Sequence, residues 1–210
     1  HMEWIGSEKT GYRGLYQKLF ECFPTSGKLT MIVLQADGGL DEVRRIKKEV
    51  RDINNIGFSS VHITDTKEEL LRLLNLTCNE HGLHYLNNAD LISEYKRGVI
   101  DSLRSKAIKA RVGCESFAVD GSLLLDIYGL RKAEDIDIVA SSDMVDIYAL
   151  MGFESRVKEL KYHGRSADDL VFDPNYSFYL FGVRFIGFDQ LARMKKKRGE
   201  HKDILDLKLM

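Results

Sequence analysis

Two aspartates near the middle of the chain have the spacing of a metal-binding pair. Asp135 and Asp137 are separated by one residue and lead into the apolar run 138–140. Alternate residues of a β-strand point to the same face, so a strand here would project both carboxylates from one surface. Carboxylates held this close repel each other unless a divalent cation or a cationic group lies between them. The pair therefore predicts a metal site.

The segments around this pair have to form the frame that positions it. An apolar, strand-like run that begins at Phe117 ends at Gly121-Ser122, and an amphipathic helical stretch follows. The second strand-like run then carries the two aspartates. A longer helix is predicted over Ala89–Ala110, with apolar residues on one side and Lys and Arg on the other. The predicted order is helix, strand, Gly-Ser turn, helix and strand.

This order resembles the nucleotidyltransferase superfamily, which has the fold of DNA polymerase beta. The superfamily pattern is Gly-Gly or Gly-Ser, a helix and then Asp-x-Asp, and here residues 123–134 separate Gly121-Ser122 from Asp135. The segment Tyr128–Arg131 is also similar to the Leu-Gly-Arg segment of tRNA nucleotidyltransferases. Those enzymes place an Arg before their helical Asp, where this chain has Leu125. The resemblance therefore extends to the superfamily and not to that enzyme.

The C-terminal segment Gly187–Met210 carries a second resemblance. It is similar to the helical pattern that closes small nucleotidyltransferase domains, and its matching residues are Lys195, Arg198, Lys202, Asp203 and Asp206. Together the two patterns extend over residues 89–210, so the resemblance implies a mixed-sheet nucleotidyltransferase-like domain in that part of the chain.

The resemblance implies an enzyme that transfers a nucleoside monophosphate from an NTP to a hydroxyl or phosphate of an acceptor. Asp135 and Asp137 would be catalytic residues that hold Mg²⁺ or Mn²⁺, since these ions prefer hard oxygen ligands and bridge to phosphates. Gly121 would let backbone N–H groups approach the triphosphate, and Ser122 would add a hydroxyl near a helix start. Further nucleotide contacts would come from Lys195, Arg198 and Lys202. The acceptor is open among small molecules, sugar phosphates, proteins and RNA.

The superfamily normally has a third catalytic, metal-binding carboxylate on a neighbouring strand. Asp169 is the favoured candidate, because it precedes the apolar run 170–172, which is predicted to be a strand. Asp173 is the alternative third ligand, although an Asp before Pro174 is typical of a turn.

Other interpretations of these residues stay open. Gly121-Ser122 could be an ordinary strand-to-helix turn with Ser122 as the helix cap, and the two aspartates could be solvated strand ends. The basic run Lys195–Arg198 could be a solvated helix face. The alternative function is a nucleotidyltransferase-like binding module without catalysis, as part of a larger enzyme. A nucleic-acid end-modifying enzyme is disfavoured, since 31 Lys and Arg against 32 Asp and Glu leave no overall basic charge.

Residues 1–88 are predicted to be a separate α/β segment of unknown role, with the nucleotidyltransferase-like domain at 89–210. One short helix is expected within residues 3–26. Alternating strands and helices follow, which is typical of an α/β layer: strands at Leu29–Ala36 and Ser60–Ile63, helices at Leu40–Ile53 and from Thr66 to about Asn79, and a link over 82–88. The predicted class of the whole chain is α/β (α+β) with a mixed sheet.

The amino-acid composition indicates in which cellular compartment the chain is expected. At 210 residues with 44% hydrophobic side chains it can build a real core. No apolar run approaches the roughly 18 residues of a membrane span. The cysteines, Cys22, Cys78 and Cys114, lie far apart without a CxxC pair, which is typical of free thiols in a reducing compartment. We therefore expect a soluble, cytoplasmic protein without membrane partners.

Overall fold

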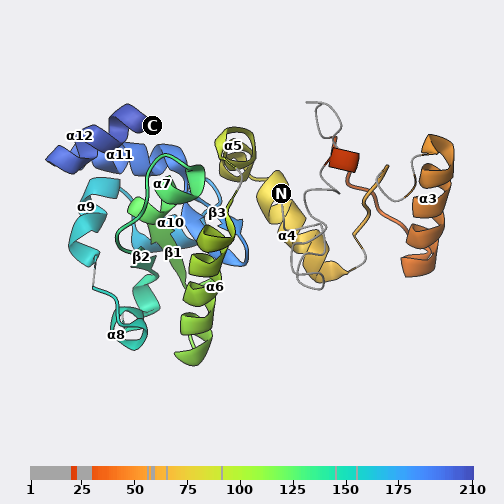
Figure 1. The fold of residues 1–210 in the computed structure, drawn as a ribbon. Helices are drawn as coiled ribbons and strands as arrows, with labels where there is room; N and C mark the ends of the chain where they lie inside the picture. The colour runs from red at the N-terminus through yellow and green to blue at the C-terminus, as the bar shows by residue number, and fades with distance from the viewer. Residues whose placement is uncertain are drawn as a thin grey trace. The chain divides into compact units, whose positions relative to one another are not determined.

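The computed structural model of the chain describes residues 20–22, 30–55, 57, 60–64, 66–90, 92–144, 146–154 and 156–210 (Figure 1). The chain divides into two compact units between Leu73 and Leu74, N-terminal to the predicted division after residue 88. Helix α5 (Glu80–Asn88) belongs to the second unit, because it packs against strand β3 (Ser177–Leu180). Most of the predicted short helix within residues 3–26 lies outside the described residues.

Two helices of the first part of the chain agree with the sequence patterns. Helix α3 (Gly39–Asn54) confirms the predicted amphipathic helix and ends at Asn55, which adopts the left-handed conformation with φ 52°. Helix α4 (Lys67–Thr77) confirms the next one, and the Thr66 hydroxyl oxygen accepts a hydrogen bond from the Glu69 backbone N–H at 3.1 Å. These helices were predictable because their periodicity and caps are local features.

The two strands predicted for the first unit are wrong over the described residues. Residues 30–36 and 60–64 have no regular secondary structure, and Leu29 lies outside the described residues. The apolar side chains of 31–34 are between 40% and 73% exposed. A strand needs a neighbour for its backbone N–H and C=O groups, and all strands of the described part of the chain lie between Phe117 and Ile186.

The second unit is built on a four-stranded mixed sheet in the order β2-β1-β4-β3. Its strands are β1 (Phe117–Asp120), β2 (Asp137–Ala140), β3 and β4 (Val183–Ile186). Strand β1 pairs parallel with β4 and antiparallel with β2, and β3 pairs antiparallel with β4. This mixed sheet with helices packed on it confirms the predicted α/β class.

One face of the sheet is covered by helix α10 (Ala167–Phe172). Its residues Leu170 and Val171 form a buried cluster with Ala118 of β1, Val139 of β2 and Ile186 of β4. Ala118 and Val139 are direct partners in the β1–β2 register. Side chains two residues apart on a strand share a face of the sheet. Asp120, two residues after Ala118, and Asp137, two residues before Val139, therefore point to the side of the sheet that α10 covers.

The remaining helices surround this sheet (Figure 1). They are α6 (Glu94–Lys109), α7 (Ser122–Tyr128), α8 (Ile147–Met151), α9 (Leu160–His163), α11 (Phe188–Arg198) and α12 (His201–Leu209), with 3-10 turns at Ser142–Met144 and Val157–Glu159. The predicted link at 82–88 is helical instead, because the Asn79 side chain caps α5. The predicted helix at 89–110 begins only at Glu94, after the capping residue Ser93.

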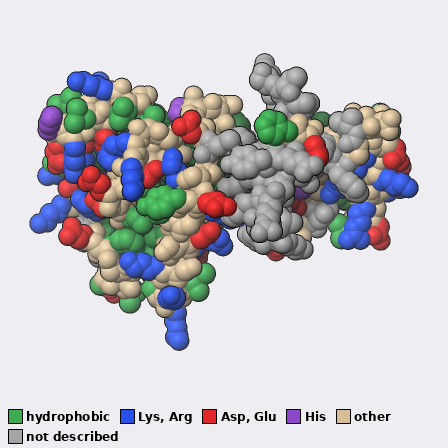
Figure 2. Space-filling view, in the orientation of Figure 1, with side chains coloured by type: hydrophobic (Ala, Val, Ile, Leu, Met, Phe, Trp, Pro, Cys, Tyr) green, Lys and Arg blue, Asp and Glu red, His purple; other side chains and the backbone are tan. Residues whose placement is uncertain are grey.

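The charge distribution on the surface and the lengths of the helices indicate which kinds of partner the chain can bind. Acidic and basic side chains are interspersed on the face of the second unit that Figure 2 shows. Among the helices that the structure describes, none combines the length and the hydrophobicity required to cross a bilayer.

Candidate functional site

A polar pocket lies where β1 ends and β2 begins. It has a volume of about 100 Å³ and is lined by Asp120, Gly121, Ser122, Arg131, Glu134, Asp135, Asp137, Arg156, Glu159, Met194, Lys195, Arg198 and Lys202. The structure thus brings two of the three predicted metal ligands, Asp135 and Asp137, together with all five predicted nucleotide-binding residues. The lining mixes carboxylates with cationic side chains, so the pocket is suited to a cation, to an anion or to both bound together.

Gly121 forms the turn at the centre of the pocket, and two features require a glycine there. Its backbone has φ 69° and ψ −135°, and a Cβ atom would lie 2.7 Å from Asp137 Oδ2. Gly121 was expected to let backbone N–H groups approach a triphosphate. In the structure, the group that lies close to the turn is the carboxylate of Asp137. This close approach places the backbone of the turn against the candidate cation ligand.

Gly121→Ala should destabilise the fold more than Gly199→Ala, although both glycines have φ 69°. At Gly199, where ψ is 22°, the left-handed conformation alone should cost about 1 kcal/mol of unfolding free energy. At Gly121, where ψ is −135°, the backbone is in a region that residues other than glycine adopt at a higher cost. A Cβ at Gly199 meets nothing within 4 Å, whereas at Gly121 it must also displace Asp137, for a total on the order of 3 kcal/mol. Chemical denaturation followed by circular dichroism measures both losses. Equal losses would show that neither the backbone conformation of Gly121 nor its contact with Asp137 adds a cost.

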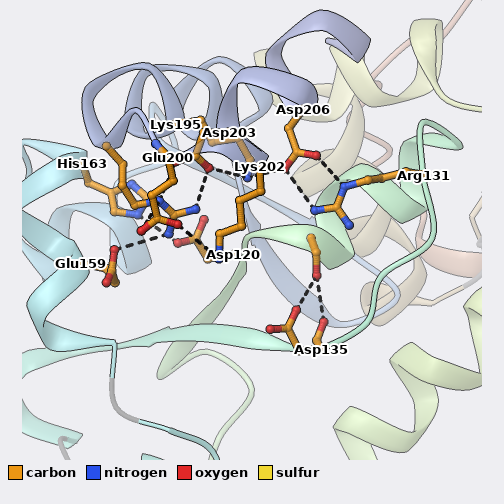
Figure 3. A network of polar contacts seen from close by, with 12 residues as sticks. Asp120, Arg131, Asp135, Glu159, His163, Lys195, Glu200, Lys202, Asp203 and Asp206 are labelled. Carbon is orange, nitrogen blue, oxygen red and sulfur yellow. Dashed lines mark hydrogen bonds and ion pairs between the residues drawn. The ribbon is translucent and has the colours of Figure 1, made fainter.

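Ser122 holds Asp135 in place. Its hydroxyl donates to the Asp135 backbone oxygen at 3.0 Å and lies 2.8 Å from Asp135 Oδ1 (Figure 3). The cap position of α7 is Gly121, and no side chain caps that helix. The interpretation of Ser122 as a simple helix cap is therefore wrong, since its hydroxyl fixes the loop that carries the first aspartate.

The two aspartates share the pocket although only one of them lies in a strand. Asp137 is the first residue of β2, and Asp135 lies in the bend before it. The cationic group between them is Arg156, whose Nη2 lies 2.6 Å from Asp137 Oδ1 and 3.8 Å from Asp135 Oδ2. Burial raises the pKa of Asp137, Arg156 opposes the rise, and the charges of Asp135 and Asp120 add to it.

The structure places both candidates for the third carboxylate outside the pocket. Residues 167–172 form helix α10, so the predicted strand there is wrong. Asp169 belongs to a capping box, in which its carboxylate accepts from the Ser166 backbone N–H and the Ser166 hydroxyl accepts from the Asp169 N–H. Asp173 follows the helix and accepts from the Asn175 N–H at 2.8 Å. The capping box satisfies first-turn N–H groups and thereby favours the helix over a strand.

Two basic residues of α11, Lys195 and Arg198, are bound to carboxylates of α12. Lys195 Nζ lies 2.7 Å from Asp206 Oδ2 and 3.4 Å from Asp203 Oδ1. Arg198 donates to both oxygens of Asp203, at 2.7 and 2.8 Å, and Arg131 donates to both oxygens of Asp206, at 2.6 and 3.1 Å (Figure 3). The two sequence patterns therefore meet in one ion-pair network. The solvated-face interpretation is wrong for Lys195, whose side chain is 3% exposed.

The network holds its two aspartates in the ionised form. Burial works against the charge of both carboxyls. Hydrogen bonds and the nearby cations nevertheless lower their pKa values, with Arg198 and Lys195 acting on Asp203 and Arg131 and Lys195 on Asp206. Lys202 differs from these cations, because its side chain is 62% exposed and pairs at 3.4 Å with the half-exposed Glu200. It is the α12 cation best placed to meet an incoming anion.

Several pocket residues were missed from the sequence. Asp120 ends β1, is buried and lies opposite Asp137 in the strand register. Its Oδ2 accepts from His163 Nε2 at 2.9 Å. Burial disfavours the charge of Asp120, but this hydrogen bond, the His163 charge, the Gly121 N–H and Lys195 hold its pKa below the ordinary value. The sequence offered one sign of this residue, since the charged Asp120 directly follows the apolar run 117–119.

Asp126 supports the loop that carries Asp135. It is buried in α7, and its carboxylate accepts from the Ala133 backbone N–H at 2.8 Å and lies 3.5 Å from Lys96 Nζ. These contacts anchor the loop between α7 and β2. The position of Asp135 therefore depends on Asp126 as well as on Ser122.

The donor set fits a hard divalent cation in its chemistry, since carboxylate oxygens are the preferred ligands of Mg²⁺ and Mn²⁺. Over the described ranges no group of three or more His, Cys, Asp or Glu side chains is already arranged as a metal site. Both predicted ligands already have partners that a cation would have to replace, since Arg156 pairs with Asp137 and Ser122 hydrogen-bonds to Asp135. A third carboxylate, Asp120, also lines the pocket, and its Oδ1 is buried without a hydrogen-bond partner.

Comparisons with protein-family models, with curated proteins and with solved structures found no match. The chemistry of the pocket therefore has to be inferred from its own side chains.

Proposed function

We propose that the chain binds an NTP with Mg²⁺ or Mn²⁺ in this pocket and transfers the nucleoside monophosphate to a hydroxyl or phosphate of an acceptor. The observation that carries the proposal is the meeting of Gly121, Asp135 and Asp137 with Arg156 and Lys202 in one pocket. Carboxylates next to cationic side chains match a metal ion bound to polyphosphate, because each sign of charge has its counterpart there.

In this proposal the acidic residues of the pocket bind the cation and the basic residues bind the phosphates. Asp135 and Asp137 would hold the cation, and a bound cation would neutralise the negative charge that develops on the phosphates during transfer. Ser122 keeps Asp135 in position through its hydroxyl. Arg156, which is 27% exposed, can leave Asp137 and donate to phosphate oxygens, a geometry that suits the planar guanidinium. Lys202 adds a second, more exposed cation.

Asp135→Asn and Asp137→Asn should each reduce metal-dependent NTP turnover by about 100-fold or more, since each removes an anionic ligand of the charge-stabilising cation. Pyrophosphate release with a panel of NTPs and acceptors measures turnover, and calorimetry measures NTP affinity with and without Mg²⁺. Asp169→Asn is the matched control, because this aspartate lies outside the pocket and should leave both values unchanged. Unchanged turnover in both pocket variants would refute the proposal.

A nucleotide-binding module without transfer is the second candidate. The ion pair of Arg156 with Asp137 favours it, as does the position of Asp169 in a helix cap away from the pocket. The two functions differ in one measurement. Pyrophosphate release above background supports the enzyme, whereas NTP binding without release for every acceptor tried supports the module.

The proposed setting is the cytoplasm, where NTPs and Mg²⁺ are abundant. Cys22, Cys78 and Cys114 are all free thiols in the structure, which agrees with a reducing compartment. The acceptor stays open among small molecules, sugar phosphates, proteins and RNA. The nearly equal numbers of basic and acidic residues, 31 and 32, favour acceptors other than a long nucleic acid, because such a partner calls for a clear basic stripe.

A further inference from the structure

Asp120 has the geometry of a ligand that faces the candidate cation site. It is the direct partner of Asp137 across the antiparallel β1–β2 pair, and side chains of such partners lie on one face with Cβ atoms about 5 Å apart. Both residues line the pocket, as does Asp135. The strand register therefore brings a third carboxylate to the position that neither Asp169 nor Asp173 reaches.

The two oxygens of Asp120 have different surroundings. Oδ2 is bonded to His163, whose side chain is fully buried and lies against Gln190. Oδ1 is buried and has no hydrogen-bond partner. An ionised oxygen left without a partner in a buried site carries a large desolvation cost. A role confined to the ion pair with His163 explains Oδ2 and leaves Oδ1 unexplained.

His163 fixes the direction in which Asp120 points. Its Nε2 lies 2.9 Å from Asp120 Oδ2 (Figure 3). On the other side of the ring, Gln190 Nε2 of α11 lies 3.5 Å from His163 Nδ1 and donates to the His163 backbone oxygen at 3.0 Å. The ring is thus held between a strand end and a neighbouring helix. A carboxylate fixed by one oxygen in this way presents its other oxygen at a defined place, which is how partners outside the coordination sphere orient metal ligands.

We propose that Asp120 Oδ1 is the third carboxylate ligand of the divalent cation in this pocket, with His163 as its positioning residue. This inference rests on the proposed function for the identity of the cation site, and it gives Asp120 the role for which the sequence favoured Asp169. Its occupant is a hard divalent cation, for which Mn²⁺ is the probe. When the cation binds, Asp120 joins Asp135 and Asp137, and Arg156 gives up Asp137.

The test measures binding of Mn²⁺ alone to the full chain by electron paramagnetic resonance, without nucleotide. Asp120→Asn should weaken the affinity at least tenfold, as Asp137→Asn does, while Asp169→Asn leaves it unchanged. His163→Leu should weaken it by about 10-fold to 100-fold, the effect expected when an outer partner of a ligand is lost. His163→Gln keeps an N–H donor and should recover most of that loss, which a merely structural role would not predict.

A measurement on the wild-type chain keeps the inference testable even where a variant fails to fold. With ¹³C in the aspartate carboxyl groups, electron-nuclear double resonance should detect three carboxylates at Mn²⁺, and two would overturn the assignment. Wild-type affinity in a folded Asp120→Asn variant would also overturn it, while leaving the proposed transferase intact. Weaker Mn²⁺ binding in that variant, combined with no NTP turnover by the wild type, would support the ligand and reject the transferase. Absence of Mn²⁺ binding to the wild type overturns the ligand assignment.

Discussion

Asp203→Asn should lower the free energy of unfolding of the chain by about 3 kcal/mol, the size expected when one partner of a buried ion pair is neutralised. Asp203 is 0% exposed and accepts from Arg198 at 2.7 and 2.8 Å, with Lys195 Nζ at 3.4 Å. The neutral amide keeps the shape of the side chain but leaves two cations with less compensating charge. Urea denaturation followed by circular dichroism measures the loss.

Asp189→Asn is the matched control for this variant. Asp189 pairs with Arg193 on α11 at 2.7 Å, and the two side chains are 50% and 64% exposed. Its other carboxylate oxygen lies 3.3 Å from His81 Nδ1, so both of its pairs involve a half-exposed carboxylate. Exposed pairs of this kind contribute less than about 1 kcal/mol, so the control should unfold nearly as the wild type does. A loss of similar size in both variants would contradict a special role for the buried network.

The same variant has a defined dependence on pH. The pKa of Asp203 is lowered in the folded chain, while the unfolded value is about 3.9. Its stabilisation is therefore fully present above the unfolded pKa and is lost as the pH falls through the folded pKa. The difference in unfolding free energy between wild type and Asp203→Asn should be constant near neutral pH and shrink below about pH 4. A difference that stays constant into acid would contradict this.

The central stretch was predictable because each of its elements has a local cause. The apolar run of β1 stops at Gly121, helix α7 follows, and Asp137 opens β2. The closing helices were recognisable too, but the partners of their charges were not. Lys195 and Arg198 were expected to contact a nucleotide, and the structure binds them to Asp203 and Asp206 of their own chain. A residue pattern shows which groups are present, and the packing decides what they neutralise.

The errors in secondary structure share one physical origin. Short apolar runs such as 31–34 and 170–172 fit either a strand or a buried helical turn, and periodicity cannot separate them. A strand needs a partner from elsewhere in the chain, which local sequence does not supply. For 170–172 the sequence did contain a deciding signal, since Ser166 and Asp169 have the spacing of a capping box and the structure shows that box formed.

The missing part of the candidate site comes from residues far away in the sequence. Arg156 and His163 lie after β2, in a stretch without a recognisable pattern, and they reach Asp137 and Asp120 only because the chain turns back over the sheet. Such contacts depend on tertiary packing. Asp120 was easier to predict from the sequence, because a charged residue at the end of an otherwise apolar strand needs a partner or a function.

Arg156→Met should raise the affinity of the chain for Mn²⁺ in the absence of nucleotide by about tenfold, equivalent to about 1.4 kcal/mol. The Arg156 guanidinium is 2.6 Å from Asp137 and 3.8 Å from Asp135, so it competes with a divalent cation for the same oxygens. Methionine keeps much of the apolar stem and removes the charge. Electron paramagnetic resonance titration of the free ion measures the affinity.

The same substitution should act in the opposite direction on the nucleotide. If Arg156 passes from Asp137 to the phosphates when the metal enters, Arg156→Met loses a charged hydrogen bond to NTP and weakens its binding by about tenfold or more. Arg193→Met is the matched control, since Arg193 is 64% exposed and lies outside the pocket. Tighter Mn²⁺ binding with unchanged NTP affinity would show that Arg156 only neutralises Asp135 and Asp137 while no metal is bound. Weaker binding of both ligands would mean that it holds the carboxylates in place for the metal.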